Sequence, residues 1–326
     1  MSIRIGLLGP PEREEIERLR IRLEERGVEA VVLNSTTDPR IVIDGTKVEV
    51  HGVEISSLRA LMVIDLGLSL GSSGSGTAAS SRGQRLAVSR RRLACWNAAL
   101  EAIGDRVRVV NPPAPQELHS LKPWESFVEG REGLPAPWTL ATNDPRQLTS
   151  LPAMPDGWIT KSLIGGLSHT ETLDPPKEDG AARRLLGSGP MMIQQRIVGE
   201  NVRAFVVGGS VIGAAEITIR KPGEIDSRRG ASRLRRVRLP EGTRAQIART
   251  AYRWGMGFAA VDLMRNPRNG KYWILECNSA PFFVVFERST GIDVSSRLAD
   301  YLVGQRRTTP DLPADAGSNR RLPFLP

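Results

Sequence analysis

Two apolar runs near the end of the chain, joined by a short polar turn, constrain the fold more than any other feature of the sequence. They are FAAVDLM at 258–264 and YWILECNS at 272–279, and the turn between them contains NPRNG. Runs of this length around a turn of Pro, Asn and Gly predict two neighbouring antiparallel strands. Because side chains alternate along a strand, Glu276 and Asn278 share a face, and the pairing predicts that Asp262 lies beside them.

These polar side chains interrupt runs that otherwise read as buried strands. A carboxylate taken out of water is costly unless it is paired, hydrogen-bonded or bound to a metal ion. Two carboxylates and an amide oxygen are hard ligands that suit magnesium, which keeps water and takes further ligands from substrate phosphates. The set therefore predicts a magnesium site that accepts a nucleoside triphosphate. A solvent-facing edge or a structural hydrogen-bonded pair is the alternative, and Glu-x-Asn alone does not separate the two.

Two lysines extend the predicted site. Lys161 ends a predicted strand directly before the small-residue turn SLIGGLSHT, and Lys122 begins the preceding helical segment. A lysine beside the backbone N–H groups of such a turn can hold phosphate oxygens. Taken alone, each lysine is more often a surface residue, so the prediction depends on both lysines and the acidic strands converging.

The composition is typical of a globular protein. The 326 residues are 40% hydrophobic and 25% charged, and the length predicts two or three domains. No apolar run approaches the roughly 18 residues of a membrane helix, and MSIRIGLLGPPEREE becomes polar too early for a signal peptide. Only Cys95 and Cys277 and three scattered histidines are present, which argues against a disulfide framework or a zinc site. We therefore expect a cytoplasmic protein without membrane contact.

The positive charge of the chain indicates acidic partners. The net charge is +9, the pI is near 10.2, and many of the arginines lie at 220–238. This stretch lacks the interleaved aromatic residues that stack on bases. A surface facing solvent or substrate phosphates is therefore favoured over a nucleic-acid interface, and a nucleotide alone would be acidic enough to explain the charge.

The first third of the chain alternates strand and helix signals. RIVIDGTKVEVHG adds a hairpin signal, and the pattern predicts a small doubly wound α/β domain over residues 1–113. The low-complexity stretch 71–83 reads as a linker, with a mobile substrate loop as the alternative. The strands and helices behind this prediction are expected at 3–9, 12–26, 29–34, 59–68, 85–103 and 106–115.

Further regions follow the proline-rich break NPPAP. Residues 114–190 predict a short helix and extended segments, and residues 191–304 predict an antiparallel sheet with a helix at 243–255. The end of the chain, 305–326, is polar and rich in proline, which predicts a flexible tail. The fold class expected for the whole chain is α/β, with α+β character in its later part.

The order of these elements resembles the ATP-grasp superfamily, and within it the RimK-like amide-forming ligases and the related ATP-grasp peptide maturases. Six motifs occur in the family's order over about residues 1–304. They are a lysine before GLPAPWTL, a strand lysine before IGGLSHT, the hinge IQQRI, the run GENVRAFVVGG, the paired strands ending in AAVDLM and YWILECNSAP, and the closing STGIDVSSRLADYLV. The segments AAEI, DSRR and RLPEG indicate the maturase branch.

The resemblance implies an N-terminal doubly wound domain, a central lid subdomain and a C-terminal antiparallel-sheet subdomain. It implies ATP, with one or two magnesium ions or manganese held by Asp262, Glu276 and Asn278. Arg203 falls on the arginine that stabilises the transferring phosphoryl group, and the flap IGGLSHT would close over the nucleotide. The other positions implied to bind nucleotide are Lys122, Lys161, Gly165, Gly166, Gln194, Gln195 and Ile197, with Glu200 or Asn201 at the ribose or phosphates.

Some positions depart from the family pattern. Gln195 stands where a hinge glutamate is common, and His169 is unexpected in the flap. Glu216 and the residue after it stand where RimK-type enzymes carry a basic pair. Arg220 or Arg228 would replace that pair at the catalytic site, and the sequence does not choose between them.

The resemblance implies an ATP-dependent ligase that forms an amide or peptide bond between a carboxylate and an amine through an acylphosphate. The substrates are expected to be small molecules or an acidic peptide or protein, and their identity and the oligomeric state stay open. Three alternatives remain. They are a kinase of the same fold acting on a small molecule, a nucleotide-binding protein without turnover, and a polyanion-binding protein whose affinity would fall steeply with salt.

Overall fold

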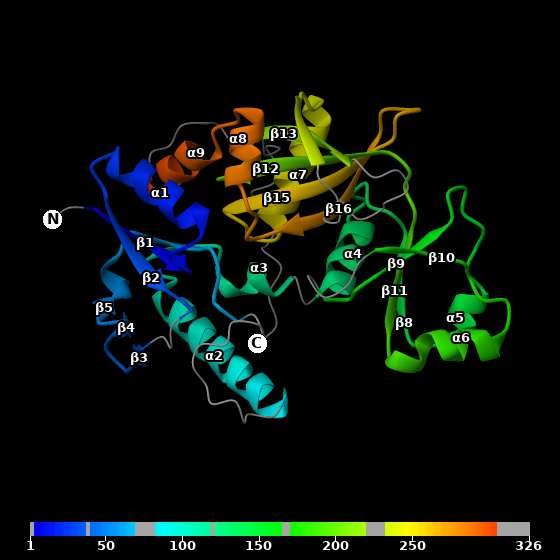
Figure 1. The fold of residues 1–326 in the computed structure, drawn as a ribbon, viewed down its shortest axis with the longest axis horizontal. Helices are drawn as coiled ribbons and strands as arrows, with labels where there is room; N and C mark the ends of the chain where they lie inside the picture. Colours follow the sequence, from blue (N-terminus) through cyan, green and yellow to red (C-terminus); the bar gives the residue numbers. More distant parts are fainter. Residues whose placement is uncertain are drawn as a thin grey trace.

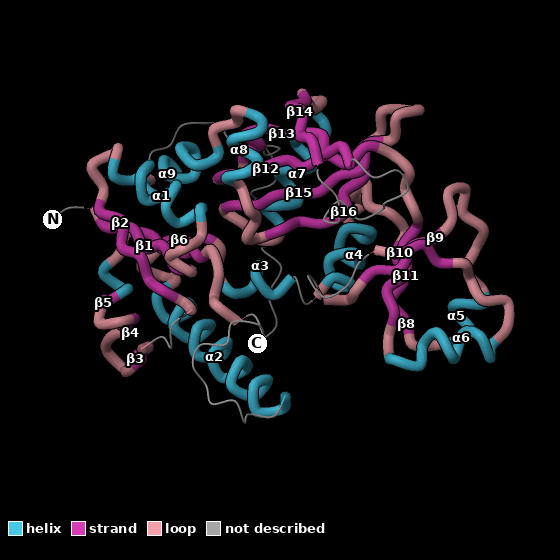
Figure 2. The backbone as a smooth tube through the Cα atoms, viewed as in Figure 1, coloured by secondary structure: helices cyan, strands magenta, loops and turns pink. Residues whose placement is uncertain are grey.

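The structure is a computed structural model, and it describes residues 3–36, 40–68, 82–118, 121–164, 170–219 and 232–304. Within these residues, three larger sheets follow one another along the chain, and a small three-stranded sheet accompanies the first (Figures 1 and 2). Across the same ranges, no helix combines the length and the apolar composition that a bilayer crossing needs.

The first sheet is parallel, with strand order β2-β1-β6-β7. Alternate residues of β1 face helices on opposite sides: Leu7 lies in one core with Ile16 of α1, and Leu8 lies in another with Trp96 of α2. This arrangement confirms the predicted doubly wound domain. Its strands and helices are β1 (Arg4–Gly9), α1 (Glu14–Glu24), β2 (Glu29–Asn34), the 3-10 turn Ile55–Ser57, β6 (Ala60–Val63), α2 (Arg82–Ile103) and β7 (Arg108–Val110).

The predicted hairpin at RIVIDGTKVEVHG is confirmed as part of the small sheet. Asp44 closes the turn, because its Oδ1 accepts hydrogen bonds from the backbone N–H of Thr46 at 2.8 Å and of Lys47 at 3.0 Å. The strands are β3 (Ile41–Ile43), β4 (Val48–Val50) and β5 (Val53–Glu54). Most of the predicted linker, residues 71–81, lies outside the described residues, and its last two residues begin α2.

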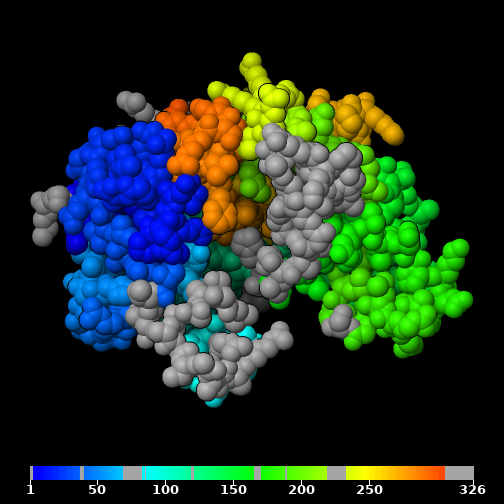
Figure 3. All heavy atoms as spheres, viewed as in Figure 1, coloured from blue at the N-terminus to red at the C-terminus, as the bar shows by residue number. Residues whose placement is uncertain are grey.

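The second sheet is antiparallel, with strand order β10-β9-β11-β8, over a small core that includes Leu148, Trp158 and Ile193. β11 pairs with β8 and β9, so this sheet extends to Gln195, beyond the predicted region 114–190. In Figure 3 this part (green) forms a lobe on the side away from the first sheet (blue). Its elements are α3 (Pro113–Glu117), α4 (Lys122–Arg131), β8 (Thr139–Thr142), α5 (Pro145–Thr149), β9 (Trp158–Lys161), β10 (Glu171–Leu173), α6 (Asp179–Leu185), the 3-10 turn Leu186–Ser188 and β11 (Met191–Gln195).

The third sheet is antiparallel, with strand order β14-β13-β12-β15-β16. On one face, here called the α8 face, Phe205 and Phe258 pack with Phe283 beside α8 and α9. On the other, the α7 face, Val261 packs with Ile247 of α7. Its elements are β12 (Glu200–Val207), β13 (Ser210–Ile219), β14 (Ser232–Val237), α7 (Glu241–Arg253), β15 (Phe258–Arg265), β16 (Tyr272–Asn278), α8 (Val284–Thr290) and α9 (Val294–Val303). The predicted tail 305–326 lies outside the described residues.

Helix α1 joins the first domain to α8 and α9 (Figure 1). Along one side of α1, residues about one turn apart contact α8 or α9. Glu15 accepts hydrogen bonds from the backbone N–H of Phe283 at 3.3 Å and of Val284 at 3.4 Å. Arg18 pairs with Glu287 at 2.5 Å, and further along the helix region Arg26 pairs with Asp300 at 2.8 Å. These contacts hold the first and third sheets in a defined relation.

Asn111 provides a second connection, directly after β7. It is fully buried, and its Nδ2 donates to the carbonyl oxygens of Phe258 and Ser279, each at 2.6 Å. Its Oδ1 accepts from the N–H of Gly257 at 2.8 Å and of Phe258 at 3.2 Å. One amide side chain therefore fixes the start of β15 and the residue that follows β16.

Candidate nucleotide and metal site

The paired strands β15 and β16 bring the predicted metal ligands together. Asp262 lies opposite Glu276 and Ala260 lies opposite Asn278, as the sequence predicts. The register shifts after Asp262, where the next pair is Leu263 with Ile274. The additional residue in β16 is a β-bulge, and a bulge changes the face to which the following side chains point. It places Glu276 and Asn278 on the α8 face with Asp262.

Arg203 lies on the neighbouring strand β12, directly opposite Asp262. Its Nε donates to Asp262 Oδ1 at 2.7 Å and its Nη2 donates to Oδ2 at 2.9 Å. Such a two-point contact between guanidinium and carboxylate is the strong form of this interaction. The charge of Asp262 raises the pKa of Arg203, so the guanidinium stays protonated. Two other carboxylates of this sheet, Glu200 and Glu216, pair with Arg265 and Arg235.

The two predicted lysines reach the same place from other elements. Lys122 is the first residue of α4, and its Nζ lies 3.2 Å from Glu276 Oε2. Lys161 is the last residue of β9. Burial lowers the pKa of Lys161, and the charge of Glu276 opposes that shift. Strands β9, β15 and β16 and helix α4 therefore bring both lysines close to the acidic pair.

Two buried glutamates on α4 lie next to this site, and sequence reasoning missed them. Glu125 and Glu129 are 4% and 3% exposed. Burial, reinforced by the charge of Glu276, raises the pKa of Glu125 to about 8, and burial with the charge of Glu125 raises the pKa of Glu129 well above its ordinary value. A signal was present, because Glu125 and Glu129 are four residues apart in the helix that begins at Lys122, and this spacing places an acidic pair on one side of a helix.

The predicted hinge residues lie at the end of β11. Gln194 is 2% exposed, its Nε2 donates to Thr139 Oγ1 at 3.0 Å, and its Oε1 is buried without a hydrogen-bond partner among the described residues. A buried polar atom without a partner is costly and is typical of a place that receives a ligand or water. Gln195 and Ile197 are partly buried beside it.

Of the two residues considered for ribose or phosphate contact, one shares the site and the other does not. Asn201 lies two residues before Arg203 on β12, so both side chains point to the α8 face. Glu200 points to the α7 face, where its Oε2 accepts a hydrogen bond from Arg265 Nη1 at 2.6 Å. Gly165, Gly166 and His169 of the flap and the arginines Arg220 and Arg228 lie outside the described residues.

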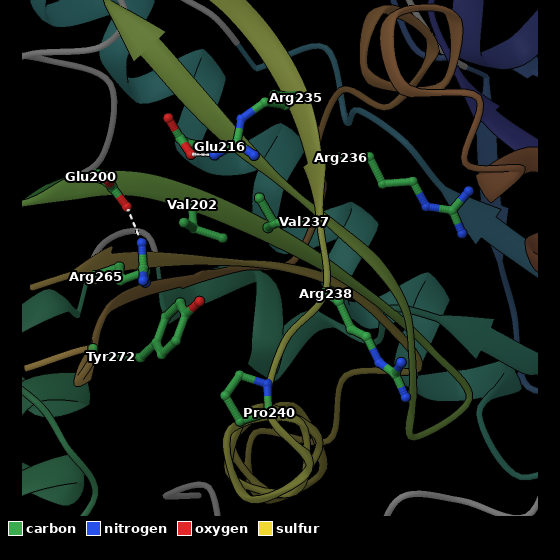
Figure 4. A pocket seen from close by; sticks show the side chains of 11 residues that line it. Glu200, Val202, Glu216, Arg235, Arg236, Val237, Arg238, Pro240, Arg265 and Tyr272 are labelled. Atoms are coloured by element: carbon green, nitrogen blue, oxygen red, sulfur yellow. Dashed lines mark hydrogen bonds and ion pairs between the residues drawn. The ribbon is translucent and has the colours of Figure 1, made fainter. Parts of the chain in front are cut away.

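A cavity of about 500 Å³ lies on the α7 face around Glu200. Figure 4 shows its ion pairs, Glu200 with Arg265 and Glu216 with Arg235, above an apolar floor that includes Val202. The cavity is on the opposite side of the sheet from Asp262 and Glu276, so it is separate from the acidic site.

The donor set of the acidic site fits a hard divalent cation. Asp262 and Glu276 supply carboxylate oxygens, and Asn278 supplies an amide oxygen from the same face. These are the oxygen ligands that magnesium and manganese take in proteins. Among the described residues, no group of three His, Cys, Asp or Glu is placed to hold a metal ion; the acidic site differs in combining two carboxylates with one amide.

Part of this chain is similar to a known protein family. Residues 180–302 match the family model of the RimK-like ATP-grasp domain, the segment that contains Arg203, Asp262, Glu276 and Asn278. This region of the chain is similar to a RimK-like ATP-grasp domain. A curated relative, the probable alpha-L-glutamate ligase of Maridesulfovibrio salexigens, is 32% identical over 104 residues, which is 32% of this chain and 34% of that protein. The chain thus spans about a third of the length of this relative.

Solved structures extend the likeness of fold to nearly the whole chain. The ATP-grasp ligase PsnB complexed with minimal precursor gives a TM-score of 0.79 at 24% identity, covering 93% of this chain and 99% of PsnB. The macrocyclase MdnC bound with precursor peptide MdnA, from Microcystis aeruginosa, gives 0.73 at 18%, covering 92% and 99%. PsnB complexed with minimal precursor, Mg and ADP gives 0.75 at 23%, covering 92% and 97%. The ATP-grasp fold therefore includes the parallel domain that precedes the RimK-like region.

Proposed function

We propose that the protein is an ATP-dependent carboxylate–amine ligase that forms an amide or peptide bond and releases ADP and phosphate. The observation that carries the proposal is the meeting of Asp262 and Glu276 with Arg203 and Lys122 on the α8 face of the third sheet. Two acidic and two basic side chains there match the needs of a metal-bound triphosphate, which requires carboxylates for the cation and cations for the phosphates.

The chemistry needs little from the protein beyond position and charge. A carboxylate oxygen of the substrate attacks the terminal phosphorus of ATP, and ADP leaves. The amine nitrogen then attacks the acyl carbon, phosphate leaves, and the nitrogen gives up a proton. Arg203 would hold the transferring phosphoryl oxygens, because its planar fork suits them. Arg220 or Arg228 would serve the substrate or the phosphoryl group in place of the basic pair that is missing at 216–217.

Asp262, Glu276 and Asn278 would hold one or two magnesium ions, or manganese, which neutralise phosphate charge when bound. Lys122 and Lys161 would contact the phosphates. In the structure Lys122 pairs with Glu276 and Arg203 pairs with Asp262. Both basic side chains would therefore move from the carboxylates to the phosphates when the nucleotide binds. The hinge residues Gln194, Gln195 and Ile197 would face the base, Asn201 the ribose or phosphates, and the flap containing Gly165 and Gly166 would exclude water.

We further propose that the acylated substrate is a glutamate or aspartate side chain of a peptide. Two observations support this class. Relatives of the RimK-like region carry the name alpha-L-glutamate ligase, and the structures that resemble the whole chain hold precursor peptides. An acidic peptide also suits a chain with a net charge of +9.

A phosphate-release assay tests the proposal. The protein with ATP and magnesium would be screened against amino acids, acidic metabolites and acidic peptides, alone and in pairs. We expect release that needs both a carboxylate and an amine, and its loss in Glu276→Ala and Asn278→Ala. Glu101→Ala, on the exposed surface of α2, is the matched control and should behave as the wild type.

The outcomes separate the alternatives. Release that is unchanged in Glu276→Ala refutes the site. ADP formation with a stable phosphorylated product and no need for an amine would identify a kinase instead.

A further inference from the structure

The metal-ligand strand β16 lies at the edge of its sheet. The outward N–H groups of an edge strand have no strand partner and need another acceptor when they are buried. Two outward N–H groups of β16 donate to acceptors outside the sheet. The N–H of Ile274 donates to the carbonyl oxygen of Pro135 at 2.7 Å, and the N–H of Cys277 donates to Glu125 Oε1 at 2.7 Å.

The second of these bonds lies inside the metal-ligand segment. Cys277 stands between Glu276 and Asn278, and the bulge of β16 lies just before Glu276. Glu125 is buried on α4, one turn after Lys122, which contacts Glu276 itself. Successive contacts from one helix therefore hold two successive residues of the strand. The thiol of Cys277 points to the α7 face, toward Met256, and not toward the metal-ligand side chains.

We propose that Glu125 is a positioning residue for the metal site: by accepting the Cys277 N–H, it fixes β16 in the bulged register that points Glu276 and Asn278 toward Asp262. The inference rests on the proposed function, because it assigns a purpose to that orientation. A one-residue change of register turns every following side chain to the other face. Without the bulge, Glu276 would share the α7 face with Ile274 and would leave Asp262 without its partner.

Hydrogen bonding to Cys277, rather than charge or burial at this place, is what the proposal requires. Glu125→Gln keeps a carbonyl oxygen in position and should preserve the register. Glu125→Leu removes the acceptor, and Glu125→Asp keeps the carboxyl group but shortens the side chain so that it no longer reaches the Cys277 N–H. Glu129→Leu is the matched control, because Glu129 is buried on the same helix and its Oε1 has no hydrogen-bond partner among the described residues.

The test measures binding of Mn²⁺ by calorimetry to protein saturated with ADP, and binding of ADP without metal. We expect Glu125→Leu and Glu125→Asp to weaken Mn²⁺ binding by about 10-fold or more, the range found for outer partners of metal ligands. ADP binding without metal should change little. Glu125→Gln and Glu129→Leu should bind Mn²⁺ as the wild type does. Hydrogen exchange in the metal-free protein should rise at 272–278 in Glu125→Leu and not in Glu129→Leu.

The contrary results are distinct. Wild-type Mn²⁺ affinity in Glu125→Leu or Glu125→Asp, or an equal loss in Glu129→Leu, would overturn the positioning role and leave the proposed function intact. Loss in Glu125→Gln equal to that in Glu125→Leu would show that the carboxyl group acts other than by accepting the Cys277 N–H, and would also overturn the positioning role. If the wild type with ADP binds no Mn²⁺, the proposed function fails together with this inference. Should Glu125→Leu not fold, Glu125→Asp decides the matter.

Discussion

Replacing Asn111 should cost the protein a large part of its stability. The side chain is fully buried and makes four hydrogen bonds, to the backbone of Gly257, Phe258 and Ser279. Asn111→Ala leaves two carbonyl oxygens and two N–H groups without that partner. A buried group left without its partner costs about 1–3 kcal/mol. Gly257 is partly exposed, and water entering the vacated space would satisfy some groups.

We therefore expect Asn111→Ala to lower the free energy of unfolding by about 3–6 kcal/mol, against a usual total of about 5–15 kcal/mol. Urea unfolding, monitored by tryptophan fluorescence, measures this loss of free energy. The dependence of the free energy on urea concentration should be the same as in the wild type, because a change in it would indicate an altered denatured state. Asn111→Asp sharpens the test. It retains the acceptor for Gly257 and Phe258 but sets a carboxylate oxygen where Nδ2 lay 2.6 Å from two carbonyl oxygens.

The Asn111→Asp variant should accordingly be at least as unstable as Asn111→Ala at neutral pH and should recover stability on acidification, when protonation restores a donor. A loss below about 1 kcal/mol in Asn111→Ala, the ordinary effect of a surface change, would refute the reasoning. So would an Asn111→Asp variant whose stability, relative to the wild type, does not improve as the pH falls.

Three further predictions concern charged residues in and next to the site. Lys122→Met should raise the affinity of the nucleotide-free protein for Mn²⁺, because Glu276 loses the ammonium group that pairs with it, and it should weaken ADP binding. Calorimetry measures both affinities. If both rose or both fell, Lys122 would not exchange Glu276 for phosphate when the nucleotide binds. Arg203→Lys should lower turnover by about 100-fold with the fold retained, because a lysine cannot replace the two-point contact; near-wild-type rates would exclude its role. Burial raises the pKa of Glu129, so the folded state keeps a proton that the unfolded chain releases. The free energy of unfolding should therefore fall as the pH rises above about 4.5, by up to about 1.4 kcal/mol per pH unit. Glu129→Leu should remove that part of the slope in urea unfolding at a series of pH values, whereas an unchanged slope would contradict it.

The sequence predicts the acidic pair correctly because local features determine it. The NPRNG turn makes β15 and β16 neighbours, and alternation along a strand places Glu276 with Asn278. The bulge that completes the arrangement has no signal of its own in the sequence. Its position depends on the partners of the outer edge of β16, which come from residues more than a hundred positions earlier.

Contacts set by distant segments escaped prediction for the same reason. The pairing of Arg203 with Asp262 depends on the register between β12 and β15, and no turn joins those strands. Glu200 was one of two adjacent candidates for nucleotide contact, and the choice depends on which residue of β12 faces which side of the sheet. Glu125 reads as an ordinary charged residue of a helix until that helix is packed against the edge of β16.

Two residues from one connection control both ends of the metal-ligand segment. Asn111 holds the carbonyl oxygen of Ser279, and Glu125 holds the N–H of Cys277. Both lie in the stretch that leads from the first sheet to the second. A movement of either residue would displace a backbone group next to Glu276 or Asn278. For the function proposed above, we therefore expect closure over a nucleotide and formation of the cation site to be linked.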